Sequence, residues 1–445
     1  MQREEMLRKI REAGIVGAGG AGFPTYKKLD AHVEHIIANG AECEPLLYKD
    51  RYTMLREGAY LFRGLQIMRE LTGAQKVTIA IKEKNRDIAE IYAEKARNEG
   101  VDFFIYEDVY PAGDEYILVY EITGRRIPPG GIPLQVGAVV DNVETIVNIA
   151  RAVDENQPVL DKFISVTGEV KEAVTLRVPV GTLFEDCLAL AGGLTTDQPA
   201  YLTGGVMMGK VKESAQEAVS KTLGGLIVLP RDHYLIRKKT TPKEVYTRIG
   251  HGQCDQCSLC TEMCPRYILG YPIEPHKVMR NLLMTGEAKE RASLWAQYCV
   301  ECNVCTMIAC PEGLDPMHIC IDAKALLKEK GLSRTEDELE ILFRDVHPAR
   351  PGREIPITTV YRRLGLVPYD RQNTFREVDF SPRKVRLALN AHIGAPAQPL
   401  VRVGDRVKRG QKIADVPEGQ LGAPVHASIE GRVTEIGENG ITIEQ

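Results

Sequence analysis

Apolar and polar positions follow two different periods in the first 155 residues. Apolar residues recur at helical spacing in three stretches, residues 3–13, 54–72 and 86–99. Short apolar runs typical of strands lie between them, HVEHIIA at 32–38, KVTIAIK at 76–82 and DFFIYE at 102–107. Strands that alternate with helices at these lengths predict crossover units and a largely parallel sheet. An α/β domain is therefore expected over residues 1–155.

The pattern changes four times after residue 155. Two strand-like runs, a helix and further strands within residues 156–231 predict a small α+β domain with a mixed sheet. Residues 232–346 are predicted to be mostly helical, and residues 347–384 form a proline-punctuated connector. Short β-patterned stretches between glycines over residues 385–445 indicate a small β-barrel or sandwich.

Composition excludes several classes of protein. The chain has 445 residues, of which 44% are hydrophobic and 27% charged, so several ordinary cores are expected. A net charge of −4 offers no general attraction to nucleic acid or to an anionic membrane. No apolar run reaches 18 residues, and the N-terminus is predicted to be an amphipathic helix rather than a signal peptide. We therefore expect a soluble cytoplasmic protein that neither binds nucleic acid nor inserts into a membrane.

Cysteine usage is the strongest chemical signal. Eight of the 11 cysteines lie between Cys254 and Cys310. Three cysteines at two-residue spacing, followed by Cys264-Pro265, form the pattern in which a fourth cysteine ligates the other cluster of a pair. The pattern recurs from Cys299, with one extra residue before Cys310-Pro311. The sequence therefore predicts two 4Fe-4S clusters.

The spacing also predicts which cysteines share a cluster. One set is Cys254, Cys257, Cys260 and Cys310, and the other is Cys299, Cys302, Cys305 and Cys264. A pair of structural zinc sites is the alternative, since CxxC pairs also bind zinc. A third cysteine two residues on, in both copies, favours the clusters. Cys187 and Cys320 are expected in cores, whereas Cys43 is either redox active or a small residue in a turn.

A glycine-rich loop precedes the first predicted strand. Residues 17–22 read Gly-Ala-Gly-Gly-Ala-Gly, which satisfies G-x-G-x-x-G, but the loop does not follow a strand and runs into Phe23-Pro24. It is either a flexible turn or a loop whose bare amides approach a phosphate or a ring, with Lys28 near to supply positive charge. Three later segments suggest the same pocket, NGAECEP at 39–45, YPAGDE at 110–115 and DNVET at 141–145.

Together these strings identify a family resemblance. GAGGAGFPTYKK, NGAECEP, YPAGDE and DNVET, in that order, resemble the flavin-bearing subunit of complex I and the RnfC component of the Rnf complex. With the dicluster motif and the terminal HIGAPA and LGAPVHASIEGRV, the chain resembles more closely the NADH-dependent cobalamin reductases of propanediol-utilisation microcompartments. The barrel-like unit follows the clusters here, whereas the RnfC component is expected to carry it at its N-terminus.

The resemblance implies roles for individual residues. The FMN phosphate would be held by Gly17, Gly19, Gly20 and Lys28. The flavin and its ribityl chain would meet Asn39, Glu42, Asn142 and Thr145, and the YPAGDE segment would add Tyr110, Gly113 and Asp114 to the cofactor pocket. Phe23 and Glu115 would face NADH, Phe23 by stacking. Ala18, Ala41 and Asp141 depart from the complex I pattern.

The implied architecture is a Rossmann-like flavin domain, a β-grasp soluble-ligand-binding domain, a helical dicluster ferredoxin domain and a barrel-sandwich hybrid. The implied function is electron transfer from NADH through FMN and two 4Fe-4S clusters to cobalamin. A relay subunit of the Rnf type, donating to another acceptor or complex, is the alternative. Adenosyltransferase and microcompartment shell proteins are the further partners that the resemblance implies. Met6, Leu7 and Ile10 share one side of the N-terminal helix, which suits packing on the flavin domain or docking to a shell protein.

Overall fold

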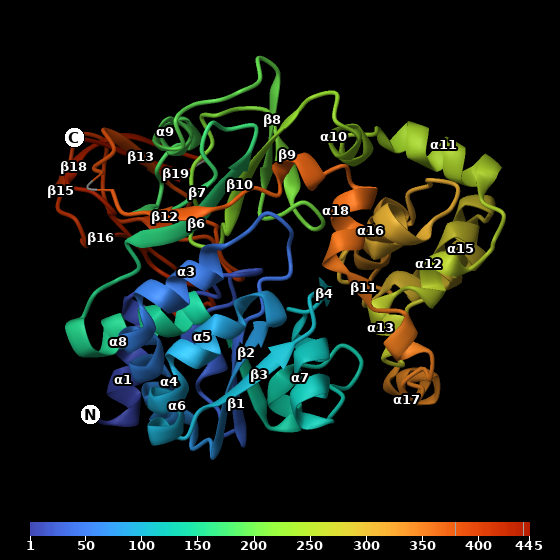
Figure 1. The fold of residues 1–445 in the computed structure, drawn as a ribbon, viewed down its shortest axis with the longest axis horizontal. Helices are drawn as coiled ribbons and strands as arrows, with labels where there is room; N and C mark the ends of the chain where they lie inside the picture. Colours follow the sequence, from blue (N-terminus) through green and yellow to red (C-terminus); the bar gives the residue numbers. More distant parts are fainter. Residues whose placement is uncertain (379, 439) are drawn as a thin grey trace.

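The computed structural model describes residues 1–378, 380–438 and 440–445, which form four regions (Figure 1). The first region holds a four-stranded sheet in the order β3-β2-β1-β5. Its strands are β1 (His35–Gly40), β2 (Lys76–Lys82), β3 (Asp102–Tyr106) and β5 (Ala138–Asn142). Every neighbouring pair is parallel, which confirms the predicted parallel sheet.

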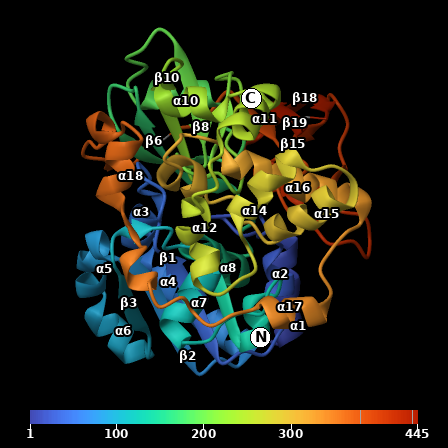
Figure 2. The same cartoon turned by 90° about the vertical axis from the view of Figure 1, so that its right-hand side faces the viewer.

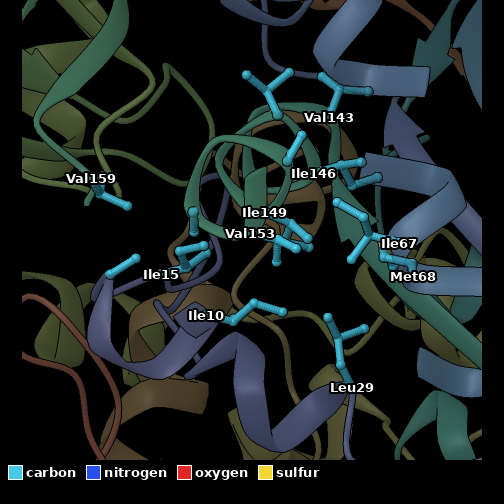
Figure 3. Close-up of a cluster of buried hydrophobic side chains, with 14 of the residues drawn as sticks. Ile10, Ile15, Leu29, Ile67, Met68, Val143, Ile146, Ile149, Val153 and Val159 are labelled. Atoms are coloured by element: carbon cyan, nitrogen blue, oxygen red, sulfur yellow. The ribbon is translucent and has the colours of Figure 1, made fainter. Parts of the chain in front are cut away.

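Helices cover both faces of this sheet. They are α1 (Arg3–Glu12), α2 (Thr25–Lys28), α3 (Lys49–Arg56), α4 (Gly58–Thr72), α5 (Arg86–Ile91), α6 (Ala93–Glu99), α7 (Glu115–Thr123) and α8 (Val143–Glu155). Because successive strand residues point to opposite faces, Ile36 belongs to the core formed with α1, α4 and α8, whereas Ile37 belongs to the core formed with α7. Figure 3 shows Ile146 and Ile149 of α8 meeting side chains of α1 and α4. Met6 and Ile10 are buried there, so the N-terminal helix packs on this region.

Two of the predicted helices are each interrupted. The stretch expected as one helix over 54–72 consists of α3 and α4, separated at Glu57. A Cβ atom on the next residue, Gly58, would lie 2.0 Å from the hydroxyl of Tyr92, so this close approach requires glycine. The Glu57 carboxylate accepts hydrogen bonds from Arg151 at 2.7 Å and Arg177 at 3.0 Å. These bonds connect the break between α3 and α4 to the helix that holds Arg151 and the strand that holds Arg177. The stretch expected as one helix over 86–99 likewise consists of α5 and α6.

The second region is a six-stranded mixed sheet in the order β12-β7-β6-β10-β8-β9. Its elements are β6 (Asp161–Gly168), β7 (Val174–Pro179), α9 (Phe184–Leu190), β8 (Pro199–Thr203), β9 (Lys210–Lys212), β10 (Gly225–Pro230) and β12 (Thr374–Arg376). Strands β6 and β10 are parallel, and β6 and β7 are antiparallel. The edge strand β12 comes from the segment predicted to be a connector, so this segment extends the sheet.

The third region is helical and carries the eight clustered cysteines; Figure 2 turns it towards the viewer. Its helices are α10 (Tyr234–Lys239), α11 (Lys243–Gln253), α12 (Leu259–Glu262), α13 (Pro265–Ile268), α14 (Pro275–Met279), α15 (Gly286–Ser293), α16 (Pro316–Lys330) and α17 (Glu336–Leu342). The chain then forms β11 (Ile355–Pro356), which pairs with β4 (Val109–Tyr110) of the first region, and α18 (Ile357–Arg363).

The fourth region consists of two small sheets, β13-β19-β18-β15 and β14-β16-β17. The strands are β13 (Lys384–Leu387), β14 (Gln398–Pro399), β15 (Arg406–Val407), β16 (Lys412–Asp415), β17 (Val425–His426), β18 (Gly431–Gly437) and β19 (Gly440–Glu444). Lys412 forms an ion pair with Glu12 at the end of α1. The buried Nζ of Lys221 donates to the carbonyls of Gly14 and Pro424 at 2.8 Å each. The first, second and fourth regions therefore meet at one point.

Across the ranges that the structure describes, none of the helices combines the length and the apolar character that crossing a membrane requires.

Candidate functional site

Two of the predicted cofactor segments meet at the carboxyl edge of the first sheet. Asn39 lies next to Asn142 because β1 and β5 pair in that register. The Asn142 side chain caps α8 by accepting from the Glu144 amide at 3.1 Å. Its Nδ2 donates to the Asn39 carbonyl at 3.2 Å and to Asp50 at 3.0 Å. This edge is where open α/β sheets bind ligands.

The glycine-rich loop lies against the N-terminus of α8. The Ala18 amide donates to Thr145 Oγ1 at 2.9 Å, and a Cβ on Gly19 would lie 3.0 Å from Asn142 Nδ2. A Cβ on Gly20 would meet none of the described atoms within 4 Å. Within the described ranges, the amides of Gly19 and Gly20 donate to no protein atom. Free amides next to a helix N-terminus are suited to an anionic group such as a phosphate.

Two buried carboxylates of the predicted cofactor segments each have one oxygen without a hydrogen-bond partner among the described residues. Glu42 is buried, and its Oε1 accepts from the Asp50 amide at 3.0 Å. Burial, with the charge of Asp50 in addition, raises the pKa of Glu42 to about 7. Glu42 Oε2 and Asp141 Oδ2 have no hydrogen-bond partner among the described residues. Because buried polar atoms are normally paired, these two oxygens fit the hydroxyl and N–H donors of a flavin.

A buried cluster of charges supports these segments, and local sequence patterns did not point to most of it. Lys49 contacts Glu144 at 3.5 Å and Asn142 at 3.2 Å. Lys162 pairs with the same Glu144 and donates to the Ala18 carbonyl at 3.1 Å. Burial lowers the pKa of Lys162 to about 8. The cluster fixes the glycine loop relative to the start of α8.

The residues expected to face NADH lie at the edge of this area. Lys28 Nζ donates to the Val140 carbonyl at 2.7 Å and lies 3.3 Å from Asp141 and 3.5 Å from Glu115. Burial acts to lower the pKa of Lys28, but the two carboxylates outweigh it and raise the pKa. The structure thus pairs Lys28 with carboxylates. Glu115 keeps 44% of its side chain exposed, and Phe23 is 37% exposed.

The YPAGDE segment connects this area to the cysteines. Gly113 accepts a hydrogen bond from Asn39 Nδ2 at 2.9 Å. The buried Tyr110 donates its hydroxyl proton to the Cys302 carbonyl at 2.8 Å. Asp114 caps α7 and accepts from Arg266 at 2.8 Å. Arg266 follows Cys264-Pro265, and no sequence pattern indicated its role.

The eight clustered cysteines surround two cavities. The inner cavity is lined by Cys264, Cys299, Cys302 and Cys305. The outer cavity is lined by Cys254, Cys257, Cys260 and Cys310. The grouping is the one that the spacing predicts, with Cys264 and Cys310 each crossing to the other motif. Two cavities, each lined by four cysteines, fit two copies of one group.

The two cysteine loops repeat the same backbone conformation. Gln256 and Ser258 have φ of 62° and 64°, and the corresponding Glu301 and Asn303 have φ of 59° and 67°. Left-handed non-glycine residues are uncommon, so their recurrence at matching positions indicates a structural requirement. The loops therefore share a geometry as well as a spacing.

The remaining cysteines take structural positions. Cys187 is fully buried in the core of the second region, as expected. Cys320 is fully buried in a core of the helical region. Cys43 is half-buried and packs against two cores, which together contain residues of the first, second and third regions.

Four segments of the chain match known domain families. Residues 10–151 match the Nuo51 FMN-binding domain and residues 163–211 the SLBB domain. Residues 253–315 match a 4Fe-4S dicluster domain, and residues 371–444 match the RnfC barrel sandwich hybrid domain. The chain is thus a multidomain α/β protein with an FMN-binding domain and a dicluster domain.

Curated relatives extend the match to the whole chain. The sequence is 41% identical to the protein named cobalamin reductase PduS in Salmonella typhimurium, covering 100% of this chain and 97% of that protein. It is 42% identical to the protein of the same name in Citrobacter freundii, covering 99% of this chain and 96% of that protein. One component of a proton-translocating ferredoxin:NAD(+) oxidoreductase complex in Clostridium ljungdahlii is 32% identical over 60% of this chain and 56% of that one.

Proposed function

Because this chain belongs to the cobalamin reductase family and is an oxidoreductase with FMN-binding and 4Fe-4S dicluster domains, we propose that it passes electrons from NADH to cobalamin. The observation that carries this proposal is the position of the inner cavity, whose wall includes residues bonded to the candidate flavin segments. FMN, when bound, accepts a hydride and releases single electrons, whereas a 4Fe-4S cluster takes one electron at a time.

The cluster ligands in this proposal are the cysteines of the two cavities. Cys264, Cys299, Cys302 and Cys305 hold one cluster, and Cys254, Cys257, Cys260 and Cys310 hold the other. The match of residues 253–315 to a dicluster domain supports iron-sulfur clusters over zinc. The protein supplies a separate four-thiolate cavity for each cluster.

The flavin site in this proposal is the carboxyl edge of the first sheet. Gly19 and Gly20 offer free amides to the phosphate, whereas the amide of the neighbouring Gly17 already donates to the Phe23 carbonyl at 3.0 Å. Lys28, which lies 3.3 Å from Asp141, adds positive charge. The flavin ring and ribityl chain are held by Asn39, Glu42, Asn142, Thr145, Tyr110, Gly113 and Asp114. Their fit is supported by the unpaired oxygens of Glu42 and Asp141.

NADH approaches at the exposed side of this site. Phe23 presents a ring on which a nicotinamide or adenine stacks, and Glu115 accepts hydrogen bonds from nucleotide hydroxyls. Their exposure supports these roles, because a substrate that comes and goes requires an open face. Lys28 orients Glu115 through the contact between them.

The Rnf-type relay is the second candidate and is less well supported. The cobalamin reductases align over 96–97% of their own length, whereas the Clostridium protein aligns over 56% of its length. Under the first candidate, the chain is cytoplasmic and works inside a bacterial microcompartment, beside an adenosyltransferase and shell proteins. These partners and this location rest on the resemblance to propanediol-utilisation enzymes.

Finer fold assignments belong to the same proposal. The parallel order β3-β2-β1-β5 supports a Rossmann-like flavin domain over residues 1–155. The mixed sheet supports a β-grasp domain over residues 156–231. The helices support a ferredoxin-like dicluster domain over residues 232–346. The two small sheets support a barrel-sandwich hybrid over residues 385–445. The 347–384 connector pairs with the first region through β11 and with the second region through β12.

An anaerobic experiment tests the function. The protein is purified and reconstituted without oxygen, and its flavin, iron and sulfide are counted. NADH is added to bleach the visible spectrum, and cob(III)alamin is then supplied. Bleaching followed by reduction of cobalamin supports the proposal. Bleaching without cobalamin reduction refutes cobalamin as the acceptor and favours the relay.

A further inference from the structure

The inner cavity shares its wall with the candidate flavin site. Tyr110 bonds the Cys302 carbonyl, and Arg266, which lines the inner cavity, pairs with Asp114. Cys264 belongs to one buried cluster with Ala41 and Ala112 of the two flavin segments. These contacts come from both NGAECEP and YPAGDE. The inner cavity is therefore in direct packing contact with the flavin region.

The outer cavity has different surroundings. Every residue that lines it lies between 254 and 316, within the helical region. Cys257, Asp255 and Glu312 on its rim are exposed to solvent. Its opposite side adjoins the inner cavity, because Cys260 of the outer cavity packs with Cys305 of the inner cavity and with Met317. The order in space is flavin region, inner cavity, outer cavity and solvent.

We infer that the clusters work in the reverse of their chain order: electrons enter at the inner cavity and leave through the outer cavity at the surface around Cys257. Electron transfer between buried centres becomes slower as their separation grows, so the centre packed on the flavin region is reduced first. In the overall reaction one NADH would be oxidised to NAD⁺, with release of one proton and two electrons. Two cob(III)alamins each take one electron at the exposed rim. This inference rests on the proposed function for its donor and acceptor.

Two variants, each lacking one cluster, test the order by electron paramagnetic resonance. Cys257→Ala should lose the outer cluster, and Cys302→Ala the inner one, so each should keep about four iron atoms per chain. In Cys257→Ala, NADH should still reduce the remaining cluster and give its signal, while cobalamin reduction falls at least tenfold. In Cys302→Ala, dithionite but not NADH should reduce the remaining cluster.

The opposite pattern would overturn the order. If NADH reduces the cluster of Cys302→Ala but not that of Cys257→Ala, the first motif is the entry point. These spectra involve no cobalamin, so they decide the order of the clusters independently of the acceptor. A parent protein that fails to reduce cobalamin would refute the proposed acceptor and leave the order of the clusters to be decided by the spectra.

A surface variant avoids any loss of clusters. Glu312→Lys places a long cationic side chain at the outer rim, and Glu94→Lys makes the same change on exposed α6, on the far side of the first region. Glu312→Lys should slow cobalamin reduction several-fold without changing flavin bleaching or the NADH-reduced cluster signals. Equal rates in the two variants would place the exit elsewhere.

Discussion

The ion pair between Asp114 and Arg266 holds the flavin region to the inner cavity, and its loss should be measurable. The two side chains are 13% and 8% exposed, and their nearest atoms are 2.8 Å apart. Arg266 also lies over the Tyr116 ring at 3.5 Å. The change Arg266→Met leaves a buried carboxylate without its cation, which costs about 3–5 kcal/mol.

This cost is best measured as a rate, since proteins with bound clusters seldom unfold reversibly in two states. Each ~1.4 kcal/mol corresponds to a tenfold change in rate, so less than half of the expected cost gives a tenfold effect. A chelator is added anaerobically, and the release of iron is followed by absorbance. Arg266→Met should release about half of the iron at least ten times faster than the parent, because only the inner cluster borders the broken pair.

A double-mutant cycle separates the pair from general damage. Asp114→Asn keeps an oxygen to cap α7 and removes the charge that Arg266 neutralises. The double variant should therefore release iron more slowly than Arg266→Met alone. Arg291→Met, at a side chain that is 79% exposed, is the control and should match the parent. An Arg266→Met rate within twofold of the parent, or a double variant no slower than the single, would refute the reasoning.

Three further outcomes are expected. Cys264→Ala should disrupt the cluster built on the second motif rather than the one next to it in sequence, which Mössbauer or paramagnetic resonance spectra of the variant would decide. Glu115→Gln should leave flavin and iron contents near normal and raise the apparent KM for NADH roughly ten- to a hundredfold, since a charged hydrogen bond is worth about 1.5–3 kcal/mol; an unchanged KM would remove Glu115 from the site. Burial lowers the pKa of Lys221 to about 7 from its ordinary 10.5, so between these pH values the unfolded chain binds more protons and stability should rise with pH, by at most about 1.4 kcal/mol per unit. Apparent melting temperatures, compared at one scan rate from pH 7 to 9, should therefore rise less steeply in Lys221→Met than in the parent, and parallel slopes would contradict this.

Sequence patterns predicted the parts of the molecule that depend on local periodicity or fixed spacing. The run KVTIAIK coincides with β2, because a strand buried on both faces is apolar along its length. The grouping of cysteines around the two cavities also agrees with the spacing, since Cys-Pro after a CxxCxxC run turns away from its own motif. The flavin and NADH roles of individual residues stay predictions.

Other features depend on residues that are far apart in the chain. Asp114 and Arg266 are separated by 152 positions, and nothing near either of them indicates the other. Lys162 comes from the second region to pair with Glu144 of the first. Strands β11 and β12 have only two and three residues, too few to show a period, so their segment reads as a connector. Tertiary packing fixes these elements.

The contacts between the end of α1 and the last strands have an evolutionary consequence. Lys412 pairs with Glu12, and Lys221 joins Gly14 to Pro424. The barrel-sandwich region thus lies against the beginning of the flavin region, although 400 positions of chain separate Glu12 from Lys412. A gene rearrangement that moved this region to the other end would be a circular permutation, which proteins tolerate when the joined segments are neighbours in space. This chain and the RnfC component, which is expected to have the opposite domain order, can therefore share one three-dimensional arrangement of domains and differ only in the linkers that connect them.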